Sequence, residues 1–443
     1  MLIPGPVLAC MEALERAGYE TYCVGGCVRD DALGKTPHDF DLCTAATPPQ
    51  MEAVFANRQL VLAGEKHGTV GVVTEDGVVE ITTFRREGNY ADNRHPDRVD
   101  FVTDIRQDLA RRDFTVNAMA WSPTRGLIDP FGGLEDLKKG ILRAVGDPEI
   151  RFREDALRIL RGVRFSVTYG LIPDPETEKA MLSLTPLLDH LARERVFAEL
   201  CGLLPKLTAA ELARYAPIFT QVIPELKDTV GFEQHSPHHR FDLYTHIAHV
   251  VEGVPGNLTL RWAALLHDVG KIPTFTRDET GRGHFYGHAQ VGAKMAGEIL
   301  TRLRAPAALR DQAVLLISQH MTRLMPDKRL LKRYVSRWGF DTVEKLLALQ
   351  QADMGSKGVP GEEETEVFRR VGQLLEEIQA ENGCLTLKDL ALRGGDLLNL
   401  GYRGREIGEA QQRLLDAVLD EKVPNDRTAL TRFLQELPQK QPK

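Results

Sequence analysis

Hydrophobic positions change their period along this chain. The stretch from Tyr22 to Thr47 predicts a strand, a glycine turn, a helix and a second strand, because short apolar runs enclose a turn and a mixed segment. The run from Leu60 to Arg86 predicts a β-hairpin that turns at Glu75-Asp76-Gly77. Beyond about residue 141 the apolar residues recur at helical spacing. This pattern predicts an α+β head, with helices around a sheet, followed by all-α domains.

The length of the chain adds domain boundaries to this pattern. A chain of 443 residues is too long for a single core and predicts roughly three or four domains. Composition and period place them at 1–140, 141–225, 226–360 and 361–443. No run of about 18 apolar residues occurs, so we expect no transmembrane helix. The first residues do not resemble a signal peptide, and we expect a cytoplasmic protein whose six cysteines stay reduced.

The charge of the chain argues weakly against a nucleic-acid partner. The net charge is −7, whereas binding to phosphates needs a basic surface. Arginines do gather locally, at Arg111-Arg112 and along the stretch from Arg151 to Arg164. A basic cleft is therefore compatible with the acidic total.

Two acids in the second predicted strand suggest a cation site. Asp39 and Asp41 are two residues apart, so strand geometry places both carboxylates on one face and turns Phe40 toward the core. Paired carboxylates suit Mg²⁺, which binds through few protein ligands and substrate phosphates. Glu80 shares a face with Thr82 in the hairpin. It completes a carboxylate triad or is a solvated strand residue.

Three motifs in this region resemble one family. GGCVRD, HDFDLCT and RRDFTVNAMAW resemble the nucleotidyltransferase head of the bacterial tRNA CCA-adding enzyme and poly(A) polymerase family. The resemblance implies a polymerase-β-like mixed sheet with Asp39, Asp41 and Glu80 as catalytic residues and Mg²⁺ at the aspartates. The nucleotide-binding residues it implies in the head are Gly25, Gly26, Arg29, Arg111, Arg112, Asp113 and Asn117.

The segment from Asp147 to Tyr169 predicts one helix that carries Asp155 and Arg158 one turn apart. One donor and one acceptor would read cytosine and adenine and refuse uracil and guanine. On spacing alone, an ordinary salt bridge is the alternative. EDALR, however, resembles the EDxxR template of CCA-adding enzymes, in which Glu154 would orient Arg158. By the same resemblance, Arg161 and Arg164 would face the triphosphate.

Two further segments resemble motifs of the family. LARERVFAEL contains Glu194 and Arg195, and Ala192 or Arg193 replaces the usual serine. The loop at Asp92–Pro96 resembles the DxRRP signature of members that complete the whole CCA end, with His95 in place of the second arginine.

Histidines concentrate in the third predicted domain. Nine of the 13 histidines lie between His235 and His320, which suggests imidazole ligands for a metal. The helical segments here resemble the HD phosphohydrolase superfamily, with HDVGK as the central motif. The resemblance implies a divalent transition metal or Mg²⁺ held by His246, His267, Asp268 and Asp353, and a second ion at His288 and His320. The alternative is a site that has only a structural role.

The last domain reads as paired helices, and LRGGDLLNLGYRGREIG resembles the tRNA-binding tail of CCA-adding enzymes. We therefore expect a tRNA nucleotidyltransferase that adds C, C and A from CTP and ATP, with tRNA as partner and an HD phosphohydrolase attached. The alternatives are an enzyme that adds only CC or only A, a bacterial poly(A) polymerase, and a chain that is mainly an HD phosphohydrolase. The sequence does not indicate an oligomeric state.

Overall fold

The computed structural model describes residues 1–37, 39–88, 99–235, 240–357, 361–381 and 383–436. The chain divides into two compact units, an N-terminal unit of Met1–Leu207 with Arg214–Lys227 and a C-terminal unit of Thr208–Ala213 with Asp228–Lys443. The four predicted domains divide the chain more finely, and their boundaries stay predictions. The predicted loop motif at Asp92–Pro96 lies outside the described residues.

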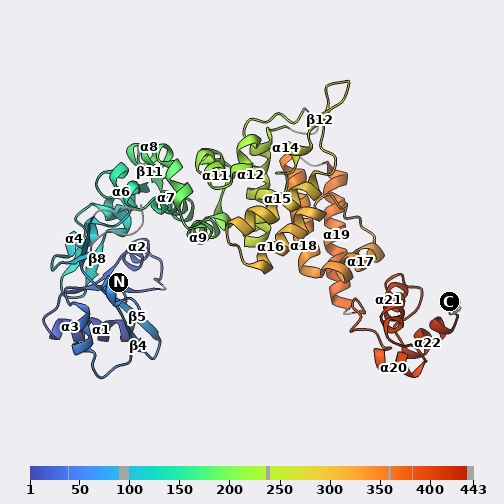
Figure 1. The fold of residues 1–443 in the computed structure, drawn as a ribbon, viewed down its shortest axis with the longest axis horizontal. Helices are drawn as coiled ribbons and strands as arrows, with labels where there is room; N and C mark the ends of the chain where they lie inside the picture. The colour runs from blue at the N-terminus through green and yellow to red at the C-terminus, as the bar shows by residue number, and fades with distance from the viewer. Residues whose placement is uncertain (38, 89–98, 236–239, 358–360, 382, 437–443) are drawn as a thin grey trace. The chain divides into compact units, whose positions relative to one another are not determined.

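A seven-stranded sheet forms the head of the N-terminal unit (Figure 1). Its strands in spatial order are β3 (Leu60–Val61), β4 (Thr69–Thr74), β5 (Gly77–Thr83), β2 (Asp41–Thr44), β1 (Thr21–Val24), β8 (Ala120–Ser122) and β9 (Gly126–Ile128). β2 and β5 run parallel, whereas the other neighbouring strands are antiparallel. The predicted mixed sheet, with β4 and β5 as its hairpin, is therefore confirmed.

β1 is buried on both faces and lies in the middle of the head. Successive strand residues face opposite sides of a sheet. Tyr22 and Val24 belong to a core that includes Leu109 of α4 (Ile105–Ala110). The Cys23 sulfur instead lies 3.7 Å from the Met11 sulfur of α1 (Gly5–Arg16), against which α3 (Pro48–Val54) packs. Helices on both sides of the sheet therefore hold the end of β1 at Val24, which Gly25 follows.

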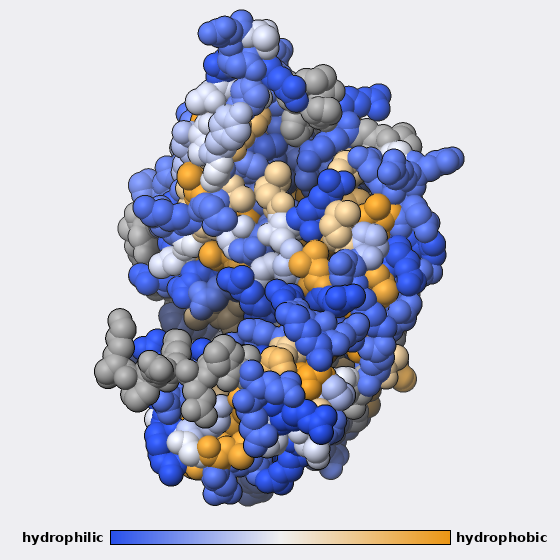
Figure 2. All heavy atoms as spheres, turned by 90° about the vertical axis from the view of Figure 1, so that its right-hand side faces the viewer, coloured by the Kyte–Doolittle hydropathy of each residue, from blue (hydrophilic) through white to orange (hydrophobic). Residues whose placement is uncertain are grey.

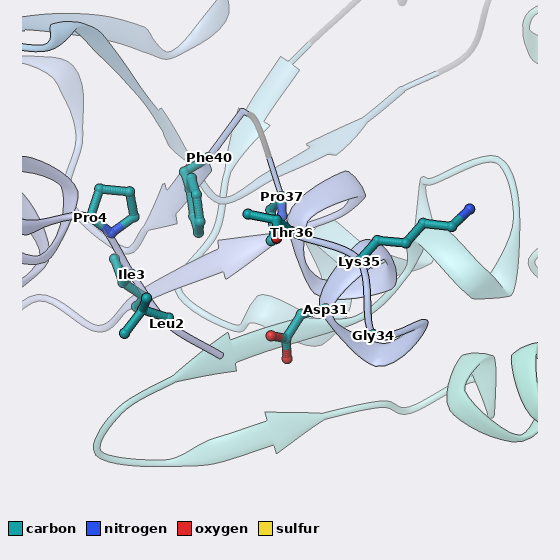
Figure 3. Close-up of a pocket in the computed structure, with 9 residues that line it drawn as sticks. All are labelled: Leu2, Ile3, Pro4, Asp31, Gly34, Lys35, Thr36, Pro37 and Phe40. Atoms are coloured by element: carbon teal, nitrogen blue, oxygen red, sulfur yellow. The ribbon is translucent and has the colours of Figure 1, made fainter.

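The predicted acidic strand is shorter than expected. β2 begins at Asp41, so Asp39 lies in the segment before the strand. Phe40 is only half-buried and does not reach the core. It lines an open hollow of about 360 Å³ together with Pro4 and Pro37 (Figure 3). The N-terminal segment thus covers part of the Phe40 ring, where strand alternation predicted core packing.

Helices dominate the chain beyond the head sheet (Figure 1). Two-residue strand pairs also occur there: β10 (Ile141–Leu142) with β11 (Ile172–Pro173), and β12 (Thr276–Arg277) with β13 (Gly283–His284). The N-terminal unit continues with α5 (Gly133–Lys139), α6 (Pro148–Glu154), α7 (Leu157–Tyr169), α8 (Pro175–Ser183), α9 (Arg193–Leu203) and α11 (Ala216–Val222). The predicted change from an α+β head to helical domains is confirmed.

The C-terminal unit is built from helices. Those of the histidine-rich part are α12 (Leu243–Gly253), α13 (Leu258–Leu266), α14 (Lys271–Thr274), α15 (His288–Arg302), α16 (Ala307–Gln319), α17 (Lys328–Trp338) and α18 (Phe340–Lys357). They are followed by α19 (Glu362–Glu381), α20 (Gly394–Asn399), α21 (Arg405–Leu419) and α22 (Arg427–Glu436). Among the described residues, no helix is both long enough and apolar enough to cross a membrane. On the face drawn in Figure 2, hydrophilic side chains predominate and hydrophobic ones form small separate groups.

The segment predicted as one helix from Asp147 to Tyr169 is two helices, α6 and α7. Asp155 separates them with an extended backbone, φ −142° and ψ 104°. Its carboxylate Oδ1 accepts a hydrogen bond of 3.0 Å from the N–H of Leu157. The break arises because this carboxylate satisfies an N–H at the start of α7, a role that short acidic side chains favour over helix interiors.

We predict that a hydroxyl at position 192 stabilises the N-terminal unit. Ala192 is the residue before α9, and it offers no side-chain acceptor to the first N–H groups of that helix. Ala192→Thr should raise the free energy of unfolding by about 1 kcal/mol, because Thr caps helices and Ala does not. Urea unfolding would measure the gain. Ala192→Val, which has the same shape without the hydroxyl, is the control, and equal effects of Thr and Val would contradict the capping explanation.

Candidate functional site

Several predicted site residues meet at one edge of the head sheet. Val24, the last residue of β1, pairs with Asp41 of β2 on one side and with Ala120 of β8 on the other. The chain then turns at Gly25, whose φ of 71° favours glycine, into α2 (Gly26–Ala32). The edge thus brings together the glycine pair, the acidic strand and the segment that leads into β8.

The two aspartates of this edge offer carboxylate ligands for a cation. Both Asp39 and Asp41 are exposed. Desolvation at the sheet edge raises the pKa of Asp41, Asp39 raises it further, and Arg112 opposes the rise. Two neighbouring carboxylates are a fitting donor set for Mg²⁺. Leu42 pairs with Ile81, so Glu80 lies on β5 at the level of Asp41, exposed to solvent.

Arg112 lies directly against the glycine turn. A Cβ added at Gly25 would come within 2.9 Å of the Arg112 Nη1, so a larger residue here would displace the guanidinium group. Asp108, which sequence reasoning did not single out, holds both neighbouring arginines: its Oδ1 lies 2.8 Å from Arg111 and its Oδ2 lies 3.3 Å from Arg112. Asp108 is three residues before Arg111 and four before Arg112, and this spacing was the sign of the pairing available in the sequence.

A chain of hydrogen bonds joins α2, the RRD motif and α7. Arg29 donates to Asn117 Oδ1 over 2.6 Å, and Asn117 donates to Asp113 Oδ1 over 3.1 Å. Arg161 of α7 donates to Asp113 Oδ2 over 2.7 Å. Burial would raise the pKa of Asp113, but Arg161, together with the hydrogen bonds, holds it below its usual value. Asp113 is therefore ionised at neutral pH and ties the head to α7.

Arg161 and Arg164 are not placed as free phosphate ligands. Arg161 pairs with Asp113, and Arg164 pairs with Glu199 of α9 over 2.6 Å. Glu199 had no signal in the sequence, because its partner lies on another helix. The assignment of these two arginines to the triphosphate stays a prediction.

The predicted base-reading residues, Asp155 and Arg158, lie at the start of α7, and different side chains pair with each of them. Arg158 donates to Glu154 Oε2 over 2.6 Å, as the resemblance implied, and also to the carbonyls of Arg151 and Arg111 over 3.0 Å each. Asp155 is paired with Arg195, which had no predicted role here. The expected Asp155–Arg158 arrangement on one helical face is replaced by a helix junction. Both groups nevertheless lie in the same segment of four residues, Asp155 to Arg158.

The predicted metal ligands of the C-terminal unit come together from five segments. His246 lies on α12, His267 directly follows α13, His288 begins α15, His320 directly follows α16, and Asp353 lies on α18; all but Asp353 are buried. Asp268 is central to them. Its Oδ2 lies 3.2 Å from the Nε2 atoms of both His246 and His267. Its Oδ1 lies 3.5 Å from His288 Nε2 and 3.9 Å from His320 Nε2.

Backbone carbonyls fix the tautomers of three of these histidines. The Nδ1 atoms of His267, His288 and His320 lie 2.7–2.8 Å from the carbonyls of Ala264, Phe285 and Ile317. A carbonyl only accepts, so each Nδ1 carries the proton and each Nε2 presents a lone pair. The Nε2 atoms of His288 and His320 are 3.2 Å apart. Two facing lone pairs at this distance fit ligands of a shared cation.

The ionisation of the cluster also fits metal binding. Burial lowers the pKa of His288 and lowers that of His320 to about 4, so both imidazoles are neutral at pH 7. His267 Nε2 makes no hydrogen bond within the described residues, although Asp268 Oδ2 lies only 3.2 Å from it. Burial opposes ionisation of Asp268, but His267 and Lys271 hold its pKa well below the usual range. Burial would lower the pKa of His246, but hydrogen bonds to Asp268 and Asp353 raise it. The site thus offers the neutral imidazoles of His288 and His320 beside the anionic carboxylate of Asp268.

Comparison with known proteins identifies the family. Three family models match: the poly A polymerase head domain at residues 21–143, the probable RNA and SrmB-binding site of polymerase A at 170–229, and the HD domain at 245–352. The CCA-adding enzyme of Bacillus velezensis is 32% identical over 429 residues, which cover 96% of each chain. That of Leuconostoc mesenteroides is 34% identical over 425 residues, which cover 96% of this chain and 94% of the relative.

A solved structure agrees with these relatives. The CCA-adding enzyme of Bacillus stearothermophilus, in complex with CTP, superposes with a TM-score of 0.68 at 26% identity and covers 98% of both chains. The chain therefore belongs to the CCA-adding enzyme family of nucleotidyltransferases. The family resemblance of the motifs and the predicted fold class are both confirmed. The roles of the individual site residues stay predictions.

We predict that the stability contributed by Asp108 depends on pH. Burial opposes its charge, but Arg111 and Arg112 hold its pKa below the usual value in the folded protein. A carboxyl with a depressed folded pKa contributes stability above its unfolded pKa of about 3.9 and loses it as the pH falls through the folded value. Asp108→Asn should therefore lower the free energy of unfolding by about 3 kcal/mol at pH 7, because it leaves two arginines without their counter-charge.

This difference should shrink below about pH 4, where the wild-type carboxyl begins to take up a proton. Denaturant unfolding of both proteins from pH 7 to pH 3 would measure it. Asp76→Asn, in the exposed turn of the hairpin, is the control and should have little effect. A destabilisation by Asp108→Asn that stays constant over this pH range would contradict the assignment.

Proposed function

We propose that this protein adds C, C and A to the 3′ end of tRNA from CTP and ATP without a nucleic-acid template. The observation that supports the proposal is that Asp155 and Arg158, three residues apart, each pair with a separate partner in the same compact unit as Asp39 and Asp41. The family membership supports it, because relatives that align over nearly the whole chain are CCA-adding enzymes.

The chemistry of the head follows from its carboxylates and arginines. Mg²⁺ bound at Asp39 and Asp41 would neutralise charge on the triphosphate and on the departing pyrophosphate and would activate the 3′ hydroxyl of the tRNA. Glu80 is the third candidate carboxylate. Arg111 and Arg112, fixed by Asp108, supply positive charge at the same edge as the glycine turn. These residues orient the nucleotide, which accounts for much of the rate in phosphoryl transfer.

Base selection follows from hydrogen-bond chemistry. Cytosine and adenine each present a ring nitrogen that accepts beside an amino group that donates, whereas uracil and guanine present a ring N–H beside a carbonyl. Arg158 only donates and an ionised Asp155 only accepts. The pair therefore matches C and A and leaves two mismatched contacts with U or G. An unmade buried hydrogen bond costs about 1–3 kcal/mol, enough for selection of tenfold or more per contact.

The remaining alternatives have separate tests. An enzyme that adds only CC or only A would use the same residues, and sequencing the product ends of a tRNA that lacks CCA distinguishes them. A poly(A) polymerase would extend the end with many adenosines, which the same products would reveal. Binding of tRNA through α20 to α22 and a cytoplasmic location also stay predictions.

The first test of the proposed function removes one carboxylate of the head. Asp39→Asn or Asp41→Asn should lower nucleotide addition to tRNA lacking its last three nucleotides by about a thousandfold or more, since the metal loses a ligand. Asp76→Asn, an exposed hairpin acid, is the matched control. The affinity for tRNA, measured by gel shift, should change little. Near-normal addition by both variants would place the metal elsewhere.

We further propose that the histidine cluster is a metal-dependent phosphohydrolase centre that binds two divalent ions. His246, His267, Asp268 and Asp353 would hold one ion, and His288 and His320, which face the other oxygen of Asp268, would hold the second. Bound ions would supply an activated water for attack on a phosphate ester. Lys271 Nζ, 2.7 Å from Asp268 Oδ2, holds the Asp268 carboxylate.

The second test separates this centre from the head. His267→Ala should lose bound metal, measured by elemental analysis after dialysis against Mn²⁺, Co²⁺ or Ni²⁺, and should lose hydrolysis of phosphomonoesters and 2′,3′-cyclic phosphates. CCA addition should persist, because the residues of the head belong to the other compact unit. His249→Ala is the control, since His249 is stacked on Phe241 and is not among the ligands. Wild-type protein that binds metal without hydrolysing any of these esters would make the centre structural.

A further inference from the structure

A serine contacts His246 through the ring nitrogen that does not face the other predicted ligands. The Nε2 atom of His246 lies 3.2 Å from Asp268 Oδ2 and 3.1 Å from Asp353 Oδ1. Its Nδ1 atom lies 2.7 Å from the hydroxyl oxygen of Ser356, in the last turn of α18. His246 and Ser356 are both buried, so this contact is shielded from solvent.

The single proton of the Ser356 hydroxyl determines how this contact is made. Ser356 Oγ also lies 2.7 Å from the carbonyl oxygen of Asp353, three residues earlier in α18. A carbonyl only accepts, so the hydroxyl donates its proton to that carbonyl. The hydroxyl oxygen then accepts from His246, whose Nδ1 has to carry a proton. In this tautomer Nε2 is the nitrogen that presents its lone pair when an ion is bound.

The position of His246 within a helix explains why a side chain takes this role. His267 and His320 directly follow α13 and α16, and each donates to a carbonyl in the last turn of its helix. The last four carbonyls of a helix have no N–H partner within it, so they are available to these side chains. His246 lies inside α12, and its N–H donates to the carbonyl of Asp242 as in a regular helix. The acceptor for its Nδ1 comes from another element, α18.

The last turn of α18 contacts a second predicted ligand as well. Lys357 Nζ lies 2.7 Å from Asp353 Oδ2, whereas Asp353 Oδ1 faces His246 Nε2. Ser356 and Lys357 therefore hold two ligands predicted for the same ion. Without the Ser356 hydroxyl, the buried Nδ1 of His246 would lose this acceptor, and its proton could move to Nε2, where it would block binding of a cation.

We propose that Ser356 is a positioning residue of the histidine cluster, which holds the imidazole of His246 in the tautomer and the plane in which Nε2 binds a divalent cation. The inference rests on the proposed metal centre, but it requires only that the centre binds an ion and not that it hydrolyses an ester. It predicts that the affinity for the ion at His246 and Asp268 depends on a hydroxyl that does not touch the ion. The ion at His288 and His320 should be held equally well with or without this hydroxyl.

The test measures metal affinity directly. Binding of Mn²⁺ to metal-free, full-length protein is followed by EPR of the unbound ion. Ser356→Ala should weaken the binding of one ion by about tenfold, because the ligand loses the group that orients it. Ser356→Thr, which keeps the hydroxyl, should bind Mn²⁺ nearly as the wild type does. Ser318→Ala is the matched control, since the Ser318 hydroxyl also donates to a carbonyl three residues back, that of Leu315, but accepts from Gln319 instead of a histidine.

A double mutant separates positioning from a general structural role. His246→Ala alone should weaken the binding of the same ion, and adding Ser356→Ala to it should weaken the binding no further, because Ser356 acts through His246. A further loss in the double mutant would overturn the inference, as would Ser356→Thr that binds as weakly as Ser356→Ala. Wild-type protein that binds no Mn²⁺ would refute the proposed metal centre, and with it this inference. Wild-type protein that binds Mn²⁺, with Ser356→Ala binding it equally well, would refute the role of Ser356 alone.

Discussion

Buried carboxylates that hold arginines are the interaction on which the N-terminal unit depends. The proposed nucleotide site gathers arginines, and arginines gathered without counter-charges repel one another. Asp108 holds Arg111 and Arg112, Asp113 holds Arg161, and Glu199 holds Arg164. Asp108 and Asp113 are buried, so solvent and salt screen these pairs less than surface pairs. The guanidinium groups are therefore held in place by carboxylates of the same unit.

The features that depend on local periodicity and composition could be predicted from the sequence. Features that depend on contacts between distant segments could not. The strands of the head, the hairpin at Glu75–Gly77 and the convergence of the histidines followed from spacing and clustering. The helix break at Asp155 was missed, because the residues of EDALR are typical of a continuous helix. The break depends on the contacts of the Asp155 carboxylate with Leu157 N–H and with Arg195. Arg195 is 40 residues from Asp155, and no periodicity links two residues on separate helices. The pairing of Asp108 with Arg111 and Arg112 could have been predicted, since residues three and four apart share one face of a helix.

The two candidate sites fix their functional groups by different means. In the head, ion pairs orient the arginines, so the positions of the side chains depend on ionised carboxylates. In the histidine cluster, neutral carbonyls of the preceding turn orient His267, His288 and His320 without adding charge. A cation site gains from this arrangement, because the charge that attracts the ion stays on Asp268 and Asp353. Additional carboxylates bonded to the imidazoles would make the site more negative and favour their protonation.

The junction between α6 and α7 shows why these anchors matter for selection. A hydrogen-bond code of one donor and one acceptor has little meaning if the two groups can pair with each other, and here they are close in sequence with opposite charges. The chain avoids this by ending α6 at Glu154, extending the backbone at Asp155 and supplying a separate partner to each group. Under the proposed function, selection between bases would depend on the packing of α6, α7 and α9.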